Sequence, residues 1–400
     1  MIQKKKVFKL SNTLQNYAWG SKHALEKLYG INNPQSLPQA EMWMGAHPKA
    51  PSQAVLNSGE TVALNQLIET EGALLLGEES ILQFGKQLPY LFKILSASEP
   101  LSIQVHPDKK QAQKGFDREN RIGLAIDAPD RNYRDANHKP ELIYAVTDFQ
   151  AMNGFRPVSE ILSLFAQIGS KQLMPLLHDL KEQQDPKGLK MFYQALMQSD
   201  EAWRKEVLSQ TLMVARSSEN AAFEMVKKLN HYYPMDMGIL SPLLLNLITL
   251  KPGEAMFLEA GTLHAYLEGT GLEVMASSDN VLRGGLTPKH VDVPELLKTI
   301  IFSPKSGNDL IVTPQCVGHE KIYPVPVKDF CFSVISLSPE DTRIETKGAE
   351  ILFCQKGEFF VDAEEGENFS LRSGESCFVS ASSRIILGGA GEMMRIGCRF

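Results

Sequence analysis

Long apolar segments are missing from this sequence. No run of about eighteen consecutive apolar residues, the length that a membrane-spanning helix needs, occurs among the 400 residues. The basic stretch from Met1 to Lys6 is not followed by an apolar core of signal-peptide length. We therefore expect a protein that stays in the cytoplasm and has no membrane partner.

Cysteine is scarce and unevenly placed. The chain has 5 cysteines, all in its last hundred residues, and they show no CxxC spacing: Cys316, Cys331, Cys354, Cys377 and Cys398. An odd number without paired spacing is typical of reduced thiols rather than of a disulfide framework or a cysteine metal site. We expect reduced and mostly buried thiols.

An excess of positive charge is also absent. The formal net charge is -6, which argues against nucleic acid as a partner. With 43% hydrophobic and 22% charged residues, the composition is that of a globular protein. A chain of 400 residues is too long for one ordinary core, so two or three domains are expected.

One segment has a helical pattern throughout. From residue 157 to residue 240, apolar residues such as Ile161, Leu162, Phe165 and Ile168 follow helical spacing, and charged or amide residues fill the gaps. The flanking sequence has the short alternating runs of strands. We predict an all-helical domain inserted into a β framework.

The stretch from Leu101 to Lys109 alternates in character, and the rest of the chain is organised around it. If residues 101–106 form a strand, Ile103 and Val105 point to one face, and Gln104 and His106 project side by side from the other. A metal ion needs three or four donors. The remaining donors must come from elsewhere in the sequence.

Two further segments can supply them. In the first, His138-Lys139-Pro140-Glu141, the last residue leads into a β-rich run. The second runs from Gly253 to His264 and reads G-x5-E-x-G-x2-H; it resembles the second cupin motif, with Glu259 where that motif usually has proline. The predicted ligands are Gln104, His106, Glu141 and His264.

These four donors are two imidazoles, one carboxylate and one amide oxygen. Zinc is the first choice for this set, and manganese, iron and cobalt also accept these ligand types. Taken singly, each residue has the alternative role of a hydrogen-bonded core or surface side chain. The joint pattern favours the metal site.

The C-terminal part repeats the second motif without its histidine. Ser373-Gly374-Glu375-Ser376-Cys377-Phe378-Val379 matches Pro252-Gly253-Glu254-Ala255-Met256-Phe257-Leu258, and Ile385 stands where the first copy has His264. Residues 315–400 are therefore expected to form a second cupin-like barrel that holds no metal.

Several segments together resemble the type I mannose-6-phosphate isomerases of the cupin superfamily. They are Leu91-Phe92-Lys93-Ile94-Leu95, Leu101 to Lys109, His138-Lys139-Pro140-Glu141 and Ser278-Asp279-Asn280-Val281-Leu282-Arg283-Gly284-Gly285. The resemblance covers nearly the whole chain. One departure is Ala18, where the family has an aspartate.

The resemblance implies a fold and an activity. The fold is mainly β with an α insertion: a catalytic cupin-type β-barrel (jelly roll) from residues 1–156 and 241–314, the helical insertion 157–240, and the cupin-like domain 315–400. The activity is the reversible conversion of mannose 6-phosphate to fructose 6-phosphate. One zinc ion would be held by Gln104, His106, Glu141 and His264, with Arg283 as the active-site arginine.

The residue types suit this aldose–ketose isomerisation. A proton that moves between adjacent sugar carbons leaves an enediolate, which a divalent cation and a guanidinium can stabilise. Because arginine stays protonated, Arg283 suits this electrostatic role better than that of a base. Lys139, two residues from Glu141, is the better acid or base, since burial and a neighbouring cation favour a neutral lysine. His138 is the alternative.

Candidate substrate-binding residues are Lys93, His138, Asp279 and Trp19. Two of them have a structural alternative: a salt bridge to Arg283, four residues later, for Asp279, and core packing for Trp19. Lys289 is a weaker candidate for the phosphate, with surface solvation as its alternative.

Two other functions fit parts of the pattern. Two histidines and a carboxylate in a cupin barrel also occur in iron-dependent oxygenases, although Gln104 would fill a position that oxygen needs. A non-catalytic cupin that binds sugar phosphates is the other. The expected partner is a small sugar phosphate, and the expected assembly is a monomer or weak homo-oligomer.

Overall fold

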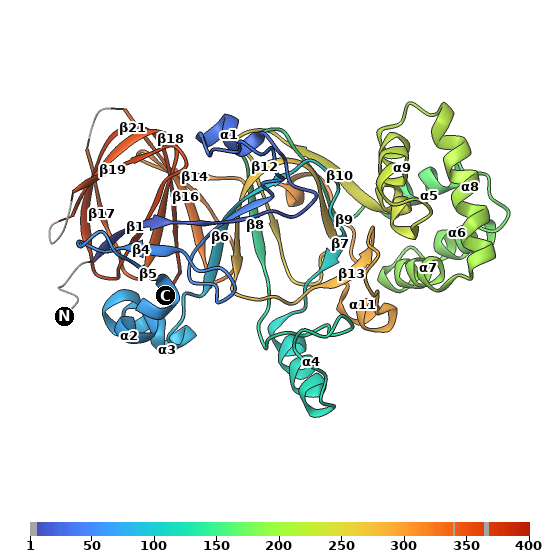
Figure 1. Ribbon diagram of the computed structural model, residues 1–400. Coiled ribbons are helices and arrows are strands. Elements are labelled where there is room, and N and C mark those ends of the chain that lie inside the picture. Colours follow the sequence, from blue (N-terminus) through green and yellow to red (C-terminus); the bar gives the residue numbers. More distant parts are fainter. Residues whose placement is uncertain (1–5, 339–340, 364–367) are drawn as a thin grey trace.

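The computed structural model describes residues 6–338, 341–363 and 368–400, and two antiparallel sheets dominate it (Figure 1). One sheet is formed by strands from the first three quarters of the chain, and the other mainly by strands from the last quarter. A group of helices lies at the end of the molecule farthest from the second sheet. The structure is mainly β with a helical insertion, as predicted.

The first sheet has ten strands and carries the predicted site. Its longest path is β10-β9-β12-β6-β3-β2, with β7 and β8 also paired to β12, β13 to β7, and β11 to β8. The strands are β2 (Thr13–Gln15), β3 (Glu41–Met44), β6 (Tyr90–Ala97), β7 (Ile103–Val105), β8 (Glu141–Ala145), β9 (Phe149–Phe155), β10 (Leu245–Leu250), β11 (Ala255–Leu258), β12 (His264–Ala276) and β13 (Leu282–Gly285).

The second sheet has eleven strands, ordered β14-β15-β16-β21-β18-β20-β1-β4-β5, with β17 paired to β21 and β19 to β18. The strands are β1 (Val7–Ser11), β4 (Gln53–Val55), β5 (Thr61–Ala63), β14 (Gln315–Val317), β15 (Glu320–Tyr323), β16 (Cys331–Leu337), β17 (Thr342–Glu345), β18 (Glu350–Ala363), β19 (Phe369–Arg372), β20 (Ser376–Val379) and β21 (Arg384–Gly397).

The sheets do not divide at the predicted domain boundary. Residues 1–156 were expected to belong to the catalytic domain, but β1 pairs with β20, and β4 and β5 follow it in the C-terminal sheet. The pattern of a single strand shows which face is buried but not which strand lies beside it, so the membership of β1, β4 and β5 in the C-terminal sheet could not be predicted.

The helical insertion follows the prediction closely. It contains α5 (Val158–Ala166), α6 (Met174–Glu182), α7 (Pro186–Gln198), α8 (Glu201–Ser217), α9 (Ala221–Tyr232), η1 (Met237–Leu240) and α10 (Ser241–Leu244). Three helices begin where a side chain caps the first turn: Asp185, Asp200 and Asn220 each accept a backbone N–H. Their apolar faces join one core with strand residues of the first sheet.

The remaining helices surround the sheets. They are α1 (Ala24–Tyr29), α2 (Leu64–Leu76), α3 (Glu78–Phe84), α4 (Lys109–Arg121), α11 (Val293–Thr299) and η2 (Gly307–Leu310). Helix α4 lies in the predicted polar excursion between His106 and Glu141, and its first turn is capped by Asp108. In the described ranges, no helix combines the length and the hydropathy needed to cross a bilayer.

All five cysteines are free thiols, as expected, but only two are buried. Cys354 and Cys377 lie in the core of the second sheet, where burial raises the pKa of each thiol to about 12. Cys331 and Cys398 are half-buried and Cys316 is exposed. The prediction of mostly buried thiols is therefore only partly correct.

Candidate active site

Three predicted ligands come together at one point of the first sheet. His106, Glu141 and His264 are all buried, and their donor atoms lie within 4.8 Å of one another. His106 follows β7, Glu141 begins β8 and His264 begins β12. Strands β7 and β8 both pair with β12, and this pairing brings the donors together.

The fourth predicted ligand is placed beside them by sheet register. Gln104 in β7 lies opposite His264 on one side and opposite Arg283 of β13 on the other. Its side chain lines the same cavity as Glu141 and His264. The sheet thus sets a guanidinium next to the metal-capable group.

The hydrogen bonds of the two histidines leave their Nε2 atoms directed at Glu141. Nδ1 of His106 lies 2.7 Å from the carbonyl of Asn280, and Nδ1 of His264 lies 2.9 Å from that of Thr262. Because a carbonyl only accepts, both Nδ1 atoms carry the hydrogen, and each Nε2 presents a lone pair. Nε2 of His106 is buried and makes no hydrogen bond within the described chain, although it lies 3.2 Å from Glu141 Oε1.

The protonation states also suit a metal ion. Burial lowers the pKa of His106 to about 4, so this imidazole is neutral near pH 7. Burial opposes ionisation of Glu141, but the charge of Lys139 and the contacts with His106 and His264 hold the pKa of this carboxyl well below its usual value. Two imidazoles and one carboxylate, with an amide beside them, are a donor set that fits zinc.

These residues form one end of a cavity of about 510 Å³. Its wall combines aromatic side chains with buried charges, and it reaches from the loop before β3 to the segment after β13. The lining includes Tyr17, Trp19, Glu41, Trp43, Lys49, Lys93, Gln104, Asn132, Arg134, Lys139, Glu141, Tyr233, His264, Tyr266, Glu273, Asp279, Arg283 and Lys289. A cavity of this size can hold a hexose phosphate.

Lys139 lies directly beside the metal-capable group. Its Nζ is 2.9 Å from Oε1 of Glu141, and the side chain is buried while still lining the cavity. Lys139 lies just before β8, and its side chain turns toward Glu141, the first residue of that strand. The two side chains are therefore in contact although their residues are two apart in the sequence. Lys139 is therefore within reach of a ligand bound near Glu141.

A buried ionic network continues from there across the sheet. Lys93 Nζ lies 2.7 Å from Glu273 and 3.3 Å from Glu41, and the Tyr266 hydroxyl donates to Glu273 (2.7 Å). Burial alone would lower the pKa of Lys93, but the two carboxylates raise it above its usual value. Lys93 is thus a paired, charged residue of the cavity wall rather than a free cation.

We call the part of the cavity wall formed by Arg134, Arg283 and Lys289 its cationic end; Arg283 lies opposite Gln104 in the sheet and so adjoins the metal-capable group. Among the described residues, no carboxylate pairs with any of the three. Burial first, and then the charge of Arg134, lower the pKa of Arg283; Arg283 in turn is the main cause of the lowered pKa of Lys289. Such clustered, unpaired cations indicate an anion site.

Comparison with known protein families and with individual proteins identifies the family of this chain. The model for phosphomannose isomerase type I, catalytic domain, matches residues 7–158, and that for mannose-6-phosphate isomerase, cupin domain, matches residues 319–397. The mannose-6-phosphate isomerase of Escherichia coli (strain K12) is 44% identical over 389 residues, which cover 97% of this chain and 98% of that protein. The chain belongs to the type I phosphomannose isomerase family. The Homo sapiens mannose-6-phosphate isomerase is 35% identical over 418 residues, 96% and 95% of the two chains.

Solved structures of phosphomannose isomerases agree with this assignment. A crystal structure of mannose 6-phosphate isomerase in its holo, zinc-bound form superposes with a TM-score of 0.94 at 44% identity, covering 99% of this chain and 100% of that chain. Another, bound with zinc and yttrium, has a TM-score of 0.93 at 43% identity with the same coverage. The two-sheet fold is thus shared along the full length of these phosphomannose isomerases.

The candidate substrate-binding residues are only partly brought together. Trp19, Lys93 and Asp279 line the cavity, whereas His138 does not. Nε2 of His138 lies 3.0 Å from both carboxylate oxygens of Asp329, a residue of the C-terminal part. The structure therefore places this side chain at a contact between two parts of the molecule and outside the cavity.

The alternative salt bridge between Asp279 and Arg283 is also wrong. Asp279 pairs with Lys49 at 2.7 Å and lies 3.6 Å from His47, both in the loop after β3. Helical spacing of four residues suggested the pair, but residues 279–283 lead into an extended strand. Arg283 is left available to a ligand.

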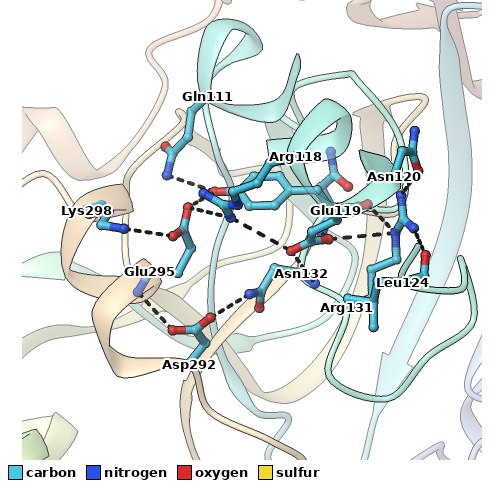
Figure 2. A network of polar contacts seen from close by, with 12 residues as sticks. Gln111, Arg118, Glu119, Asn120, Leu124, Arg131, Asn132, Asp292, Glu295 and Lys298 are labelled. Atoms are coloured by element: carbon cyan, nitrogen blue, oxygen red, sulfur yellow. Dashed lines mark hydrogen bonds and ion pairs between the residues drawn. The ribbon is translucent and has the colours of Figure 1, made fainter. Parts of the chain in front are cut away.

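Sequence reasoning missed Arg134 entirely. It lies in the loop between α4 and β8, and a buried network fixes that loop (Figure 2). Glu119 of α4 accepts the backbone N–H of Tyr133 at 2.8 Å, and Nε of the buried Arg131 donates to the Tyr133 carbonyl at 2.7 Å. In the sequence, the group of Arg131, Tyr133 and Arg134 shortly before His138 could have indicated this loop. Ties to α11 complete the network: Asn132 to Asp292 and Tyr133 to Glu295.

Proposed function

We propose that this protein interconverts mannose 6-phosphate and fructose 6-phosphate. One observation carries the proposal: a single cavity is lined both by Glu141 and His264 of the buried His–Glu–His group and by three cations that have no carboxylate partner among the described residues. The first suits the oxygens of a reacting sugar, and the second suits a phosphate. Relatives that bear the mannose-6-phosphate isomerase name match over nearly the whole chain.

The proposed metal is zinc, held by His106, Glu141, His264 and Gln104. When bound, it would supply Lewis-acid stabilisation of the negative charge that develops on the sugar oxygens. The protein's own part is to orient the two imidazoles, through the hydrogen bonds of both Nδ1 atoms, and to keep the carboxylate of Glu141 ionised beside the charge of Lys139.

At the cationic end, we assign the phosphate to Arg134 and Lys289, with Arg283 between them and the metal group. Arg283 is opposite Gln104 in the sheet, yet it is close enough to Lys289 to lower the pKa of that lysine. Its fork of donors can therefore reach a developing enediolate or the nearest phosphate oxygen. The structure supports Lys289 as a cavity residue rather than only a solvated surface lysine.

Lys139 is the proposed acid and base. Lys139 is a cation where it pairs with Glu141, so it must lose that proton before it can act as the base. As the neutral amine it would remove the proton from C2 of mannose 6-phosphate, and the resulting ammonium would return that proton to C1, while the hydroxyl proton on O2 moves to O1. Its Nζ, 2.9 Å from Glu141, lies within reach of carbons whose oxygens occupy the metal end. Substrate and product have the same composition, so no external oxidant or reductant is needed.

A coupled assay for fructose 6-phosphate formation tests the proposal. Purified protein should convert mannose 6-phosphate, lose activity on removal of metal by a chelator, and regain it with added zinc. Metal-stripped protein that works at full rate, or metal-loaded protein that forms no product, would overturn the proposal. Deuterium exchange between C2 and solvent during turnover would support the proton-transfer route over a hydride shift.

The rival functions give different results in the same preparations. An iron-dependent oxygenase would consume oxygen when iron and a 2-oxoacid are added. A non-catalytic sugar-phosphate-binding protein would bind mannose 6-phosphate without product. We further propose a cytoplasmic location and a monomer or weak homo-oligomer, which cell fractionation and sedimentation would test.

A further inference from the structure

Asn280 links the metal end of the cavity to its cationic end. This residue is fully buried between β12 and β13, three positions before Arg283. Its carbonyl accepts the hydrogen bond from Nδ1 of His106 at 2.7 Å. Its side chain contacts the loop that carries Arg134.

The side-chain amide of Asn280 makes contacts that no other residue type could reproduce. Oδ1 accepts the backbone N–H groups of Arg134 (2.7 Å) and Asp135 (3.2 Å). Nδ2 donates to the carbonyls of Asp135 (2.8 Å) and Asn137 (2.8 Å). Two N–H groups and two carbonyls are thus satisfied by one amide, and an amide alone combines an acceptor with two donors at this size.

Asp135 makes the reciprocal contacts. Its carboxylate accepts the backbone N–H of Asp279 at 2.7 Å and the hydroxyl of Ser278 at 2.8 Å, and it also lies 3.2 Å from Nδ2 of Asn280. The segment 278–280 and the loop 134–137 therefore hold each other in place. Because every polar group in this contact is used, a change in one segment must displace the other.

We propose that Asn280 is a positioning residue that sets both His106 toward the metal and Arg134 toward the phosphate. Its carbonyl fixes the tautomer and orientation of the His106 imidazole. Its side chain fixes the backbone of Arg134, and so the position of that guanidinium in the cavity. This inference rests on the proposed function only for the identity of the ligands, zinc and a phosphate group.

Asn280→Asp tests the proposal with almost no change in shape. The substitution replaces Nδ2 by an oxygen that faces two carbonyls and the carboxylate of Asp135, so the loop 134–137 should shift. We expect zinc release to a chromogenic chelator to become about tenfold faster. We also expect inorganic phosphate to bind zinc-loaded protein about tenfold more weakly by calorimetry.

A double-mutant cycle separates positioning from general destabilisation. Arg134→Ala should weaken phosphate binding by about tenfold in the wild-type background and by less than about twofold in Asn280→Asp, because the guanidinium is already displaced there. Additive effects together with an unchanged rate of zinc release would overturn the proposal.

Asn246→Asp is the matched control. Asn246 is also buried, and its Nδ2 donates to several backbone carbonyls, but it does not line the cavity. It should lower stability without changing the coupling to Arg134. If Asn280→Asp does not fold, Asp135→Asn disturbs the same contact from the other side and should give the same effects at smaller size.

Zinc release and phosphate binding do not require turnover. A protein that shows the expected coupling but forms no fructose 6-phosphate would refute the proposed function and leave the positioning role intact. An active isomerase without the coupling would support the proposed function and refute the positioning role of Asn280.

Discussion

At the scale of single residues, neighbouring side chains of the site are held in different protonation states by their surroundings. Glu141 is ionised because Lys139 and two histidines surround it, while His106 stays neutral because it is buried. At the cationic end of the cavity, Arg283 has no carboxylate partner among the described residues. Each functional side chain therefore has a protonation state that its neighbours determine.

The role of Lys139 can be isolated by Lys139→Met. Loss of the acid–base group should lower kcat by at least about a hundredfold with a small change in KM. Zinc content should be measured in parallel, because Lys139 also contacts Glu141. Lys251→Met, at an exposed ion pair, is the control and should be unchanged. Near-normal turnover of Lys139→Met would remove this lysine from the mechanism.

Arg283 can be tested by a pair of substitutions. Arg283→Ala should retain zinc, since the arginine is beside the ligands but not one of them, and should lose kcat by about two orders of magnitude. Arg283→Lys keeps the charge but not the fork of donors, so it should recover only part of the loss. Steady-state kinetics with metal analysis would measure both, and full activity in Arg283→Ala would refute the assignment.

At the scale of elements, a short strand and a loop decide where the donors lie. Strand β7 has three residues, yet its register sets Gln104 between His264 and Arg283. The loop after α4 then brings Arg134 to the same cavity, held by Glu119 and Tyr133. Helix α4 has no residue of its own in the cavity, and we infer that it serves to support this loop.

Gly115 in α4 offers a test of that support. A Cβ there would lie 2.4 Å from the ring of Tyr133, so Gly115→Ala should destabilise the protein by about 1–3 kcal/mol and raise KM. Gly72→Ala in α2 is the matched control, because its Cβ would meet Lys86 at an ordinary 3.5 Å. It should be neutral or stabilise by up to about 1 kcal/mol. Denaturant unfolding and kinetics measure both, and equal behaviour of the two variants would contradict this role for α4.

At the scale of the whole molecule, the two sheets share a core. Phe353 of β18 packs edge-on against Phe92 of β6 and Tyr29 of α1. Strand β1 at the beginning of the chain belongs to the C-terminal sheet, and His138 is bonded to Asp329 across the same boundary. The C-terminal cupin domain is therefore part of the structure that supports the catalytic sheet.

Phe353→Ala tests whether the sheets unfold together. In a Trp203→Phe background, which leaves Trp19 and Trp43 as the fluorescent residues, loss of a fully buried ring should cost about 3–5 kcal/mol and should lower the midpoint of tryptophan fluorescence along with that of circular dichroism. Phe360→Ala, at an exposed position of the same strand, should change little. If the tryptophan signal kept its wild-type midpoint, the sheets would be independent units.

The sequence indicated the residues that come together as a metal-capable group, but not the full set of cations that line the cavity. Gln104, His106, Glu141 and His264 stand out because strand alternation and motif spacing restrict their positions. Arg134 has no such pattern, since an arginine in a polar loop is usually solvated. Similarly, His138 stands beside Lys139 and Glu141 in the sequence but turns away from the cavity.

The sequence alone determined the class of the fold, the helical insertion and the candidate metal-ligating residues, because these depend on local periodicity and on spacing within single segments. Only the tertiary structure decided that β1, β4 and β5 join the C-terminal sheet, that Arg134 lines the cavity, and that Asn280 contacts both His106 and the backbone of Arg134. Those features depend on which distant segments become neighbours. Strand pairing and buried hydrogen bonds settle that choice only when the whole chain has folded.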